Sequence, residues 1–177
     1  FYHPEKTVTP FLDSLMKVSD SWPNCFANAK RSIEGIPAVL SSLPSLMDQS
    51  FINSAYNVSN INSLASILKP YGYTSAFFHG GNNGTMGFDN FTKLAGYSNY
   101  FGKKEYDGPS EEYDGHWGIF DDRFFSFMVR KINGFTPPFL SAFFSISSHH
   151  PYTIPSDYKS KIPNGLTPAQ QGMAYAD

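Results

Sequence analysis

The feature that most constrains the fold is an almost unbroken apolar run from Phe139 to Ile146. Its length suits a strand, and its lack of alternation suits a strand covered on both faces, as in parallel sheets. A second β-prone segment, Tyr73 to Phe78, lies upstream among segments with the apolar spacing of helices. Because helix and strand patterns alternate along the chain, the sequence predicts an α/β domain with a mainly parallel sheet.

Residues typical of helix ends place the expected helices. Thr9-Pro10 opens one, Asn60 is expected to cap a second, and Asp121 is expected to cap a long amphipathic helix. A short helix is expected over 89–95, and the Gly- and Tyr-rich stretch 97–118 is expected to be irregular. Apolar residues at helical spacing define the inward face of the helix after Asp121, namely Phe124, Phe125, Met128, Val129 and Ile132.

The length of 177 residues fits one domain or part of one. The chain begins at Phe1 without methionine and stops within a helical pattern, so we expect a piece that is incomplete at both ends. The net charge of -2 excludes a strongly basic nucleic-acid surface, and no stretch is long and apolar enough to span a membrane. The single Cys25 excludes an internal disulfide and a cysteine zinc cluster, and its setting without a base or cation indicates a small core residue.

Ser32 stands directly after Lys30 and Arg31 and directly before an apolar segment of helical period. A hydroxyl at a helix N-terminus lies beside unpaired N–H groups and the positive dipole end, where a phosphate or sulfate oxyanion is stabilised. An alcohol that attacks phosphorus or sulfur needs such a setting, usually with a metal to lower its pKa. The alternative is that Ser32 only caps the helix. Pro37 falls past the first turn and weakens the helix prediction.

Two predicted strands end in polar clusters, His79-Gly80-Gly81 and Ser147-Ser148-His149-His150. Ligands of parallel sheets gather at the carboxyl ends of the strands, so we expect these clusters and Ser32 to share one mouth. Adjacent residues of an extended segment point opposite ways, so at most one of the two neighbouring histidines faces the site. It acts there as a phosphate-oxygen donor or general acid, or else it is a loop histidine bonded to nearby backbone.

Other polar or aromatic residues admit a functional interpretation beside a structural one. Asp107, Asp114 and His116 could form a metal site, but nothing in their spacing defines a coordination geometry. Trp117 is interpreted first as a packing residue and second as the lining of a substrate pocket.

An ordered set of motifs resembles part of the catalytic domain of the lipoteichoic acid synthase-like phosphoglycerol transferases, which belong to the sulfatase/alkaline phosphatase superfamily. The blocks that carry the resemblance are, in order, Thr9 to Asp13, Arg31 to Ala38 with Ser42 to Pro44, Phe77 to Gly81 with Phe88 to Phe91, Trp117 to Asp121, and Ser147 to Tyr152. The resemblance implies an alkaline-phosphatase-like (sulfatase-like) sandwich with a mainly parallel central sheet. Residues 1–177 would be part of one catalytic domain, incomplete at both ends.

The resemblance also implies roles for particular residues. Ser32 matches the metal-bound nucleophile, and His149 matches the histidine that contacts the substrate phosphate, whereas His150 matches a variable position. Lys30 or Arg31 would help to neutralise the transferred group. One or two divalent cations (Mn, Mg or Zn) are implied, with Ser32 as a ligand and the remaining ligands outside this chain, so that the fragment alone would be inactive.

The implied substrates are derived from phospholipids or glycans, and the implied location is the extracytoplasmic face of the cell membrane, reached through membrane segments that are absent here. Nucleic acid is not an expected partner. Lipoteichoic acid synthases carry Trp and Arg where this chain has Met86 and Phe88, which argues against glycerol phosphate as the transferred group. The absence of a Cys-x-Pro-x-Arg motif disfavours a formylglycine sulfatase. The alternatives are a phosphodiesterase, phosphatase or sulfatase-like hydrolase that uses water as the acceptor, and a non-catalytic fragment or binding domain.

Overall fold

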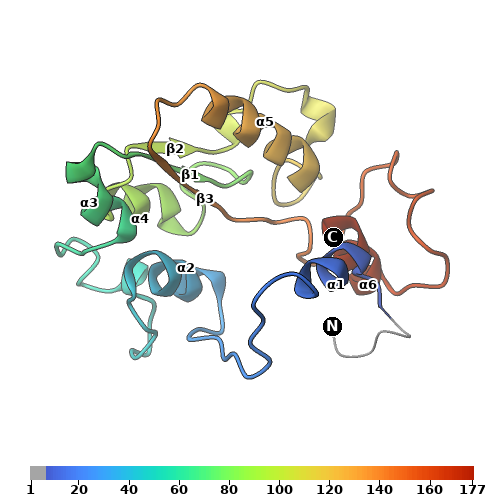
Figure 1. Cartoon of the computed structure of the whole chain (residues 1–177), viewed down its shortest axis with the longest axis horizontal. Coiled ribbons are helices and arrows are strands. Elements are labelled where there is room, and N and C mark those ends of the chain that lie inside the picture. The colour runs from blue at the N-terminus through green and yellow to red at the C-terminus, as the bar shows by residue number, and fades with distance from the viewer. Residues whose placement is uncertain (1–6) are drawn as a thin grey trace.

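The computed structural model describes residues 7–177 and contains a parallel three-stranded sheet in the order β2-β1-β3 (Figure 1). The strands are β1 (Thr74–Phe78), β2 (Asn99–Phe101) and β3 (Phe139–Phe143). β1 and β3 pair along their whole length, from Thr74 opposite Phe139 to Phe78 opposite Phe143. All three strands therefore finish at one edge of the sheet, and the predicted α/β class with a parallel sheet is confirmed.

Helices cover both faces of the sheet (Figure 1). On one face, α5 (Asp121–Asn133) packs through Phe124 and Phe127 against Ala76 and Phe78 of β1. On the other face, the core around Phe77 is completed by α2 (Ser32–Ser41), α3 (Leu64–Leu68) and α4 (Phe88–Leu94). The alternation of Ala76, Phe77 and Phe78 between the two cores explains why β1 is buried on both sides.

Two helices lie side by side away from the sheet, α1 (Pro10–Met16) and α6 (Pro168–Ala176) (Figure 1). The carboxylate of Asp177, just beyond α6, accepts the backbone N–H groups of Phe11 and Leu12 in the first turn of α1 at 2.8 and 2.9 Å. Short 3₁₀ turns connect the larger elements, at Phe51–Asn53 (η2), Lys69–Tyr71 (η3), Thr85–Gly87 (η4), Lys103–Glu105 (η5) and Ser110–Glu112 (η6). Among residues 7–177, no helix has the length and apolar character needed to cross a bilayer.

Several local predictions are wrong for reasons of tertiary structure. The helix expected from Asn60 begins after Ser63, whose hydroxyl bonds both the N–H of Ser66 and the carbonyl oxygen of Ala95. The stretch expected to be irregular contains β2, which is only three residues long. Cys25 is exposed rather than in the core.

The predicted face of α5 is also partly wrong. Phe127 is fully buried, whereas Phe125 is 51% exposed and Val129 is 43% exposed. Asp121 is the first residue of α5 rather than its cap, and its carboxylate instead accepts a backbone N–H of the segment after β3. β3 is only partly covered, unlike the strand buried on both faces that its composition predicts.

Candidate active site

A cavity of about 210 Å³ lies where the strands finish. Its lining comes from the start of α2, the residue after β1, the η4 turn, the loop before α5 and the segment after β3. These residues are Ser32, His79, Thr85, Met86, Trp117, Phe144, Ser145, Ile146, Ser148 and His149. The structure thus places Ser32 and residues of both predicted strand-end clusters around one cavity, as expected for the carboxyl ends of parallel strands.

Ser32 is the first residue of α2, and the extended Arg31 occupies the N-cap position. The Arg31 side chain makes no capping hydrogen bond, the Glu34 carboxylate accepts the Arg31 N–H from the first turn, and Ser32 lines the cavity without serving as the cap. The helix runs on to Ser41 although Pro37, which is buried, lies inside it. The first-turn N–H groups of this ten-residue helix and its positive dipole end therefore lie beside the hydroxyl.

Lys30 and Arg31 directly precede Ser32 in sequence, but neither lines the cavity. The Arg31 guanidinium donates to Glu34 from Nη2 at 2.5 Å and from Nε at 2.9 Å. The other Glu34 oxygen accepts the backbone N–H groups of Lys30 and Arg31 at 3.2 Å each. The hydrogen bond from Arg31 lowers the pKa of Glu34. Arg31 therefore stabilises the turn that leads into α2, with its side chain paired to Glu34.

His79 follows β1 and is only 3% exposed. Its Nδ1 lies 3.1 Å from the carbonyl oxygen of Phe144, which can only accept, so Nδ1 carries the proton. The ring stacks on Phe144 at 4.9 Å and meets the edge of Phe88 at 5.6 Å. Burial lowers the pKa of His79, which favours the neutral imidazole. A Cβ at Gly81 would stand 2.7 Å from Nε2, so glycine is needed at that position.

His149 lies in the turn after β3, and its imidazole is exposed to the cavity. Its Nδ1 lies 2.8 Å from the carbonyl oxygen of His150, and its ring centroid is 4.3 Å from that of Trp117. The His150 ring packs against Tyr152 and does not line the cavity. The structure places one of the two neighbouring histidines at the cavity, in agreement with the expectation of at most one.

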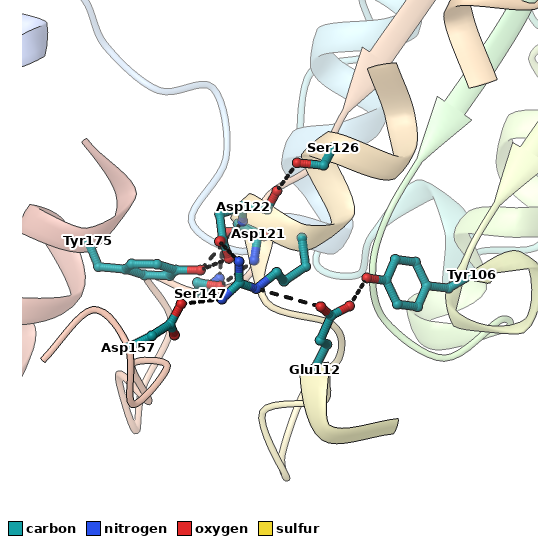
Figure 2. A network of polar contacts seen from close by, with 9 residues as sticks. Tyr106, Glu112, Asp121, Asp122, Ser126, Ser147, Asp157 and Tyr175 are labelled. Carbon is teal, nitrogen blue, oxygen red and sulfur yellow. Dashed lines mark hydrogen bonds and ion pairs between the residues drawn. The ribbon is translucent and has the colours of Figure 1, made fainter. Parts of the chain in front are cut away.

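The segment between β3 and His149 is held by Asp121 at the start of α5 (Figure 2). The Asp121 carboxylate accepts the N–H groups of Ile146 and Ser147 at 2.9 and 2.8 Å, and burial raises its pKa. Next to it, Arg123 reaches Asp122 at 3.2 Å and Asp157 at 2.5 Å. These contacts join α5, the segment after β3 and the loop before α6, and so determine where the His149 turn lies.

The described residues do not form a divalent-cation site by themselves. Within residues 7–177, no three His, Cys, Asp or Glu side chains come close enough together to hold an ion. The metal-site alternative for Asp107, Asp114 and His116 does not form, because Asp107 pairs with Arg130 at 2.6 Å and Asp114 accepts backbone N–H groups. The cavity offers hydroxyl and imidazole groups but no carboxylate, so only part of a ligand set is present.

Comparison with solved structures identifies the architecture as alkaline-phosphatase-like. A protein of the alkaline phosphatase superfamily from Vibrio parahaemolyticus matches with a TM-score of 0.79 and 25% identity, over 96% of this chain and 42% of that one. The C-terminal periplasmic domain of EcEptC from Escherichia coli, solved in complex with Zn, matches with a TM-score of 0.59 and 16% identity, over 99% of this chain and 51% of that one.

The chain belongs to the sulfatase family, whose model matches residues 1–175. Lipoteichoic acid synthase 2 of Bacillus subtilis (strain 168) is 30% identical over 152 residues, which make up 83% of this chain and 23% of that protein. The chain thus spans about a quarter of the length of this relative. The predicted family and fold are confirmed.

Trp117 is a cavity residue that its sequence context does not reveal. Its sequence favours a packing role, yet it lines the cavity and is 38% exposed. The signal that could have found it is its place directly before Gly118, because a glycine permits close contact with the glycines after β1.

Proposed function

We propose that this protein transfers a phosphoryl group through a covalent intermediate on Ser32. The observation that carries the proposal is that Ser32, at the N-terminus of a ten-residue helix, and His149 line one cavity. In the first step, Ser32 Oγ loses its proton and bonds to the phosphorus of a phosphodiester, and the leaving alcohol departs with the electron pair of the broken P–O bond and takes up a proton. In the second step, the oxygen of an acceptor alcohol or of water loses its proton and bonds to the phosphorus, and Ser32 Oγ departs with the electron pair of its P–O bond and regains a proton.

The other lining groups have proposed supporting roles. His149 holds a phosphate oxygen or protonates the leaving oxygen. The N-terminal N–H groups of α2 stabilise the negative charge on the transferred group. Lys30 and Arg31 add positive potential from outside the cavity, since Arg31 is paired with Glu34 and Lys30 does not line the site.

We propose a divalent cation (Mn, Mg or Zn) that uses Ser32 as one ligand, with further ligands from outside these residues. A bound cation would lower the pKa of the serine hydroxyl. The zinc in the EcEptC structure supports a metal in this fold. The expected result is that EDTA removes turnover by the full-length protein and that one of the three cations restores it; turnover that survives exhaustive chelation would argue against the cation.

The proposed substrates are phospholipid-derived or glycan phosphodiesters at the extracytoplasmic face of the membrane. The names of the Bacillus synthase and of the periplasmic EcEptC domain support this assignment. Met86 lines the cavity and Phe88 is fully buried, so the η4 turn contributes no cation to the cavity. This favours a transferred group other than glycerol phosphate.

The nucleophile is tested in the full-length protein with bis(p-nitrophenyl) phosphate and Mn²⁺. Ser32→Ala should remove turnover, whereas Ser32→Thr keeps a hydroxyl and should retain part of it. Mass spectrometry of acid-quenched enzyme should find a p-nitrophenyl phosphate ester on the Ser32 peptide of the parent protein and no adduct on the same peptide of Ser32→Ala. Unchanged turnover in Ser32→Ala would leave the non-catalytic binding domain as the better interpretation. Product analysis with and without a lipid or glycan alcohol distinguishes transfer from hydrolysis.

A further inference from the structure

We propose that Trp117 is a positioning residue that sets the orientation and the tautomer of the His149 imidazole. The inference rests on the proposed function, because His149 acts on a substrate only there. Trp117 comes from the loop before α5, whereas His149 comes from the turn after β3, so the pair joins two separate segments at the mouth of the cavity.

Three contacts carry the proposal, and two of them converge on the backbone carbonyl of His150. The Trp117 indole Nε1–H donates to this oxygen at 2.7 Å. His149 Nδ1 lies 2.8 Å from the same oxygen. The two rings also touch, with centroids 4.3 Å apart and planes at 60°. A carbonyl oxygen has two lone pairs, so it can accept both N–H groups at once.

The shared acceptor determines the chemistry of His149. Because a carbonyl can only accept, Nδ1 must carry a proton and is occupied. Nε2 is therefore the nitrogen left to act on a substrate, as an acceptor in the neutral imidazole and as a donor in the imidazolium. Trp117 fixes the carbonyl through its N–H and restricts rotation of the imidazole through ring contact, so both of its functions act through His149.

Trp117 is itself held firmly enough to do this. One carboxylate oxygen of Asp114 accepts the backbone N–H groups of His116, Trp117 and Gly118 at 2.8, 2.8 and 3.0 Å. Gly118 then forms a β-bridge with Gly81, three residues after the end of β1. The indole therefore projects from a loop that is tied to the central strand of the sheet, which makes it a rigid reference for the histidine turn.

The test is a double-mutant cycle on turnover of bis(p-nitrophenyl) phosphate by the full-length protein with Mn²⁺. Trp117→Phe keeps a ring and loses the N–H, and should lower kcat about tenfold; Trp117→Ala loses both and should lower it about 100-fold, as misplaced catalytic groups do. In a His149→Ala background, neither substitution should cause a further loss, because a residue that acts through another shows this non-additivity. Trp22→Phe and Trp22→Ala are the matched controls, since Trp22 is 74% exposed and does not line the cavity.

Each outcome of these measurements supports or overturns the positioning role of Trp117. Equal losses in the parent and His149→Ala backgrounds, or no loss from Trp117→Ala, would overturn the positioning role while Ser32→Ala still tests the proposed function separately. Unchanged turnover in Ser32→Ala would remove the proposed function and this inference with it. If the Trp117 variants do not fold, ¹⁵N NMR of the histidines in the parent protein decides instead. A protonated Nδ1 in neutral His149 supports the proposal, and a protonated Nε2 overturns it.

Discussion

Asp121 and Ser147 hold each other through reciprocal hydrogen bonds. The backbone N–H of Asp121 donates to Ser147 Oγ at 2.9 Å, and the Asp121 carboxylate accepts the backbone N–H of Ser147 at 2.8 Å. The same carboxylate accepts the N–H of Ile146, which lines the cavity. The start of α5 thereby fixes the path of the chain between β3 and His149 (Figure 2).

Removing this carboxylate should destabilise the protein markedly. Asp121→Ala leaves the N–H groups of the buried Ile146 and Ser147 without an acceptor, which we expect to cost about 3 kcal/mol in the free energy of unfolding. Asp121→Asn keeps one acceptor oxygen and should cost about 1 kcal/mol. Urea denaturation measures both values. Asp107→Ala is the control, because the ion pair between Asp107 and Arg130 is exposed and should contribute less than about 1 kcal/mol. Equal losses of stability in Asp107→Ala and Asp121→Ala would show that Asp121 does not hold the segment after β3 in place.

Stability should fall as the pH is lowered through the range where histidine titrates. Burial lowers the pKa of His79 below its ordinary value of 6.5. Between the lowered pKa and about 6.5, the unfolded chain binds a proton at this residue that the folded chain does not. The contribution of His79 is therefore present above pH 6.5 and is lost as the pH falls toward the folded-state pKa.

This linkage is measurable as a slope. One proton contributes at most about 1.4 kcal/mol of unfolding free energy per pH unit. Urea melts at several pH values should give a steeper decline below pH 6.5 for the parent protein than for His79→Phe, which cannot titrate. The comparison uses slopes, because His79→Phe also loses the hydrogen bond to the Phe144 carbonyl oxygen. Parallel curves for the two proteins would show that His79 is not the linked group.

Gly118 should tolerate no side chain. A Cβ there would collide with the Gly80 carbonyl and stand 2.6 Å from Ile146 Cδ1. Gly118→Ala should therefore cost about 2 kcal/mol of stability, because the backbone must shift, and should lower turnover by displacing Trp117. Gly134→Ala is the matched control, since its Cβ would meet only the Lys131 carbonyl oxygen at 3.4 Å. Thermal melts and turnover of both variants test the prediction, and equal behaviour of the two would contradict it.

Sequence patterns predicted the features that depend on local chemistry. Two of the three strands, the Thr9-Pro10 helix start and the helix over 89–95 follow from composition and spacing within a few residues. Because parallel strands end at the same edge of the sheet, the sequence also predicted that Ser32, His79 and His149 lie at one cavity. These predictions needed no knowledge of which loops touch.

What the sequence could not reveal depends on contacts between distant segments. Ser63 replaces Asn60 as a helix cap because its hydroxyl also reaches the Ala95 carbonyl. Trp117 enters the site because Asp114 and Gly118 tie its loop to the end of β1. No local pattern records these long-range contacts, so the sequence indicates polar residues that line the cavity but not the contacts that hold them in place.

The cations before Ser32 provide a last test, which separates long-range attraction from direct contact. The double variant Lys30→Gln, Arg31→Gln removes two positive charges beside the cavity, and neither side chain lines it. We expect KM for an anionic phosphodiester to rise severalfold at low ionic strength with little change in kcat, because exposed charges act through a potential that salt screens. The difference in KM between the parent protein and this variant should shrink at high ionic strength.

The control is the double variant Lys159→Gln, Lys161→Gln, which removes the same charge from the loop before α6 and should leave KM unchanged. A fall in kcat of about 100-fold would instead place one of the two cations in contact with the reacting phosphate, and an unchanged KM at every salt concentration would remove both from substrate binding.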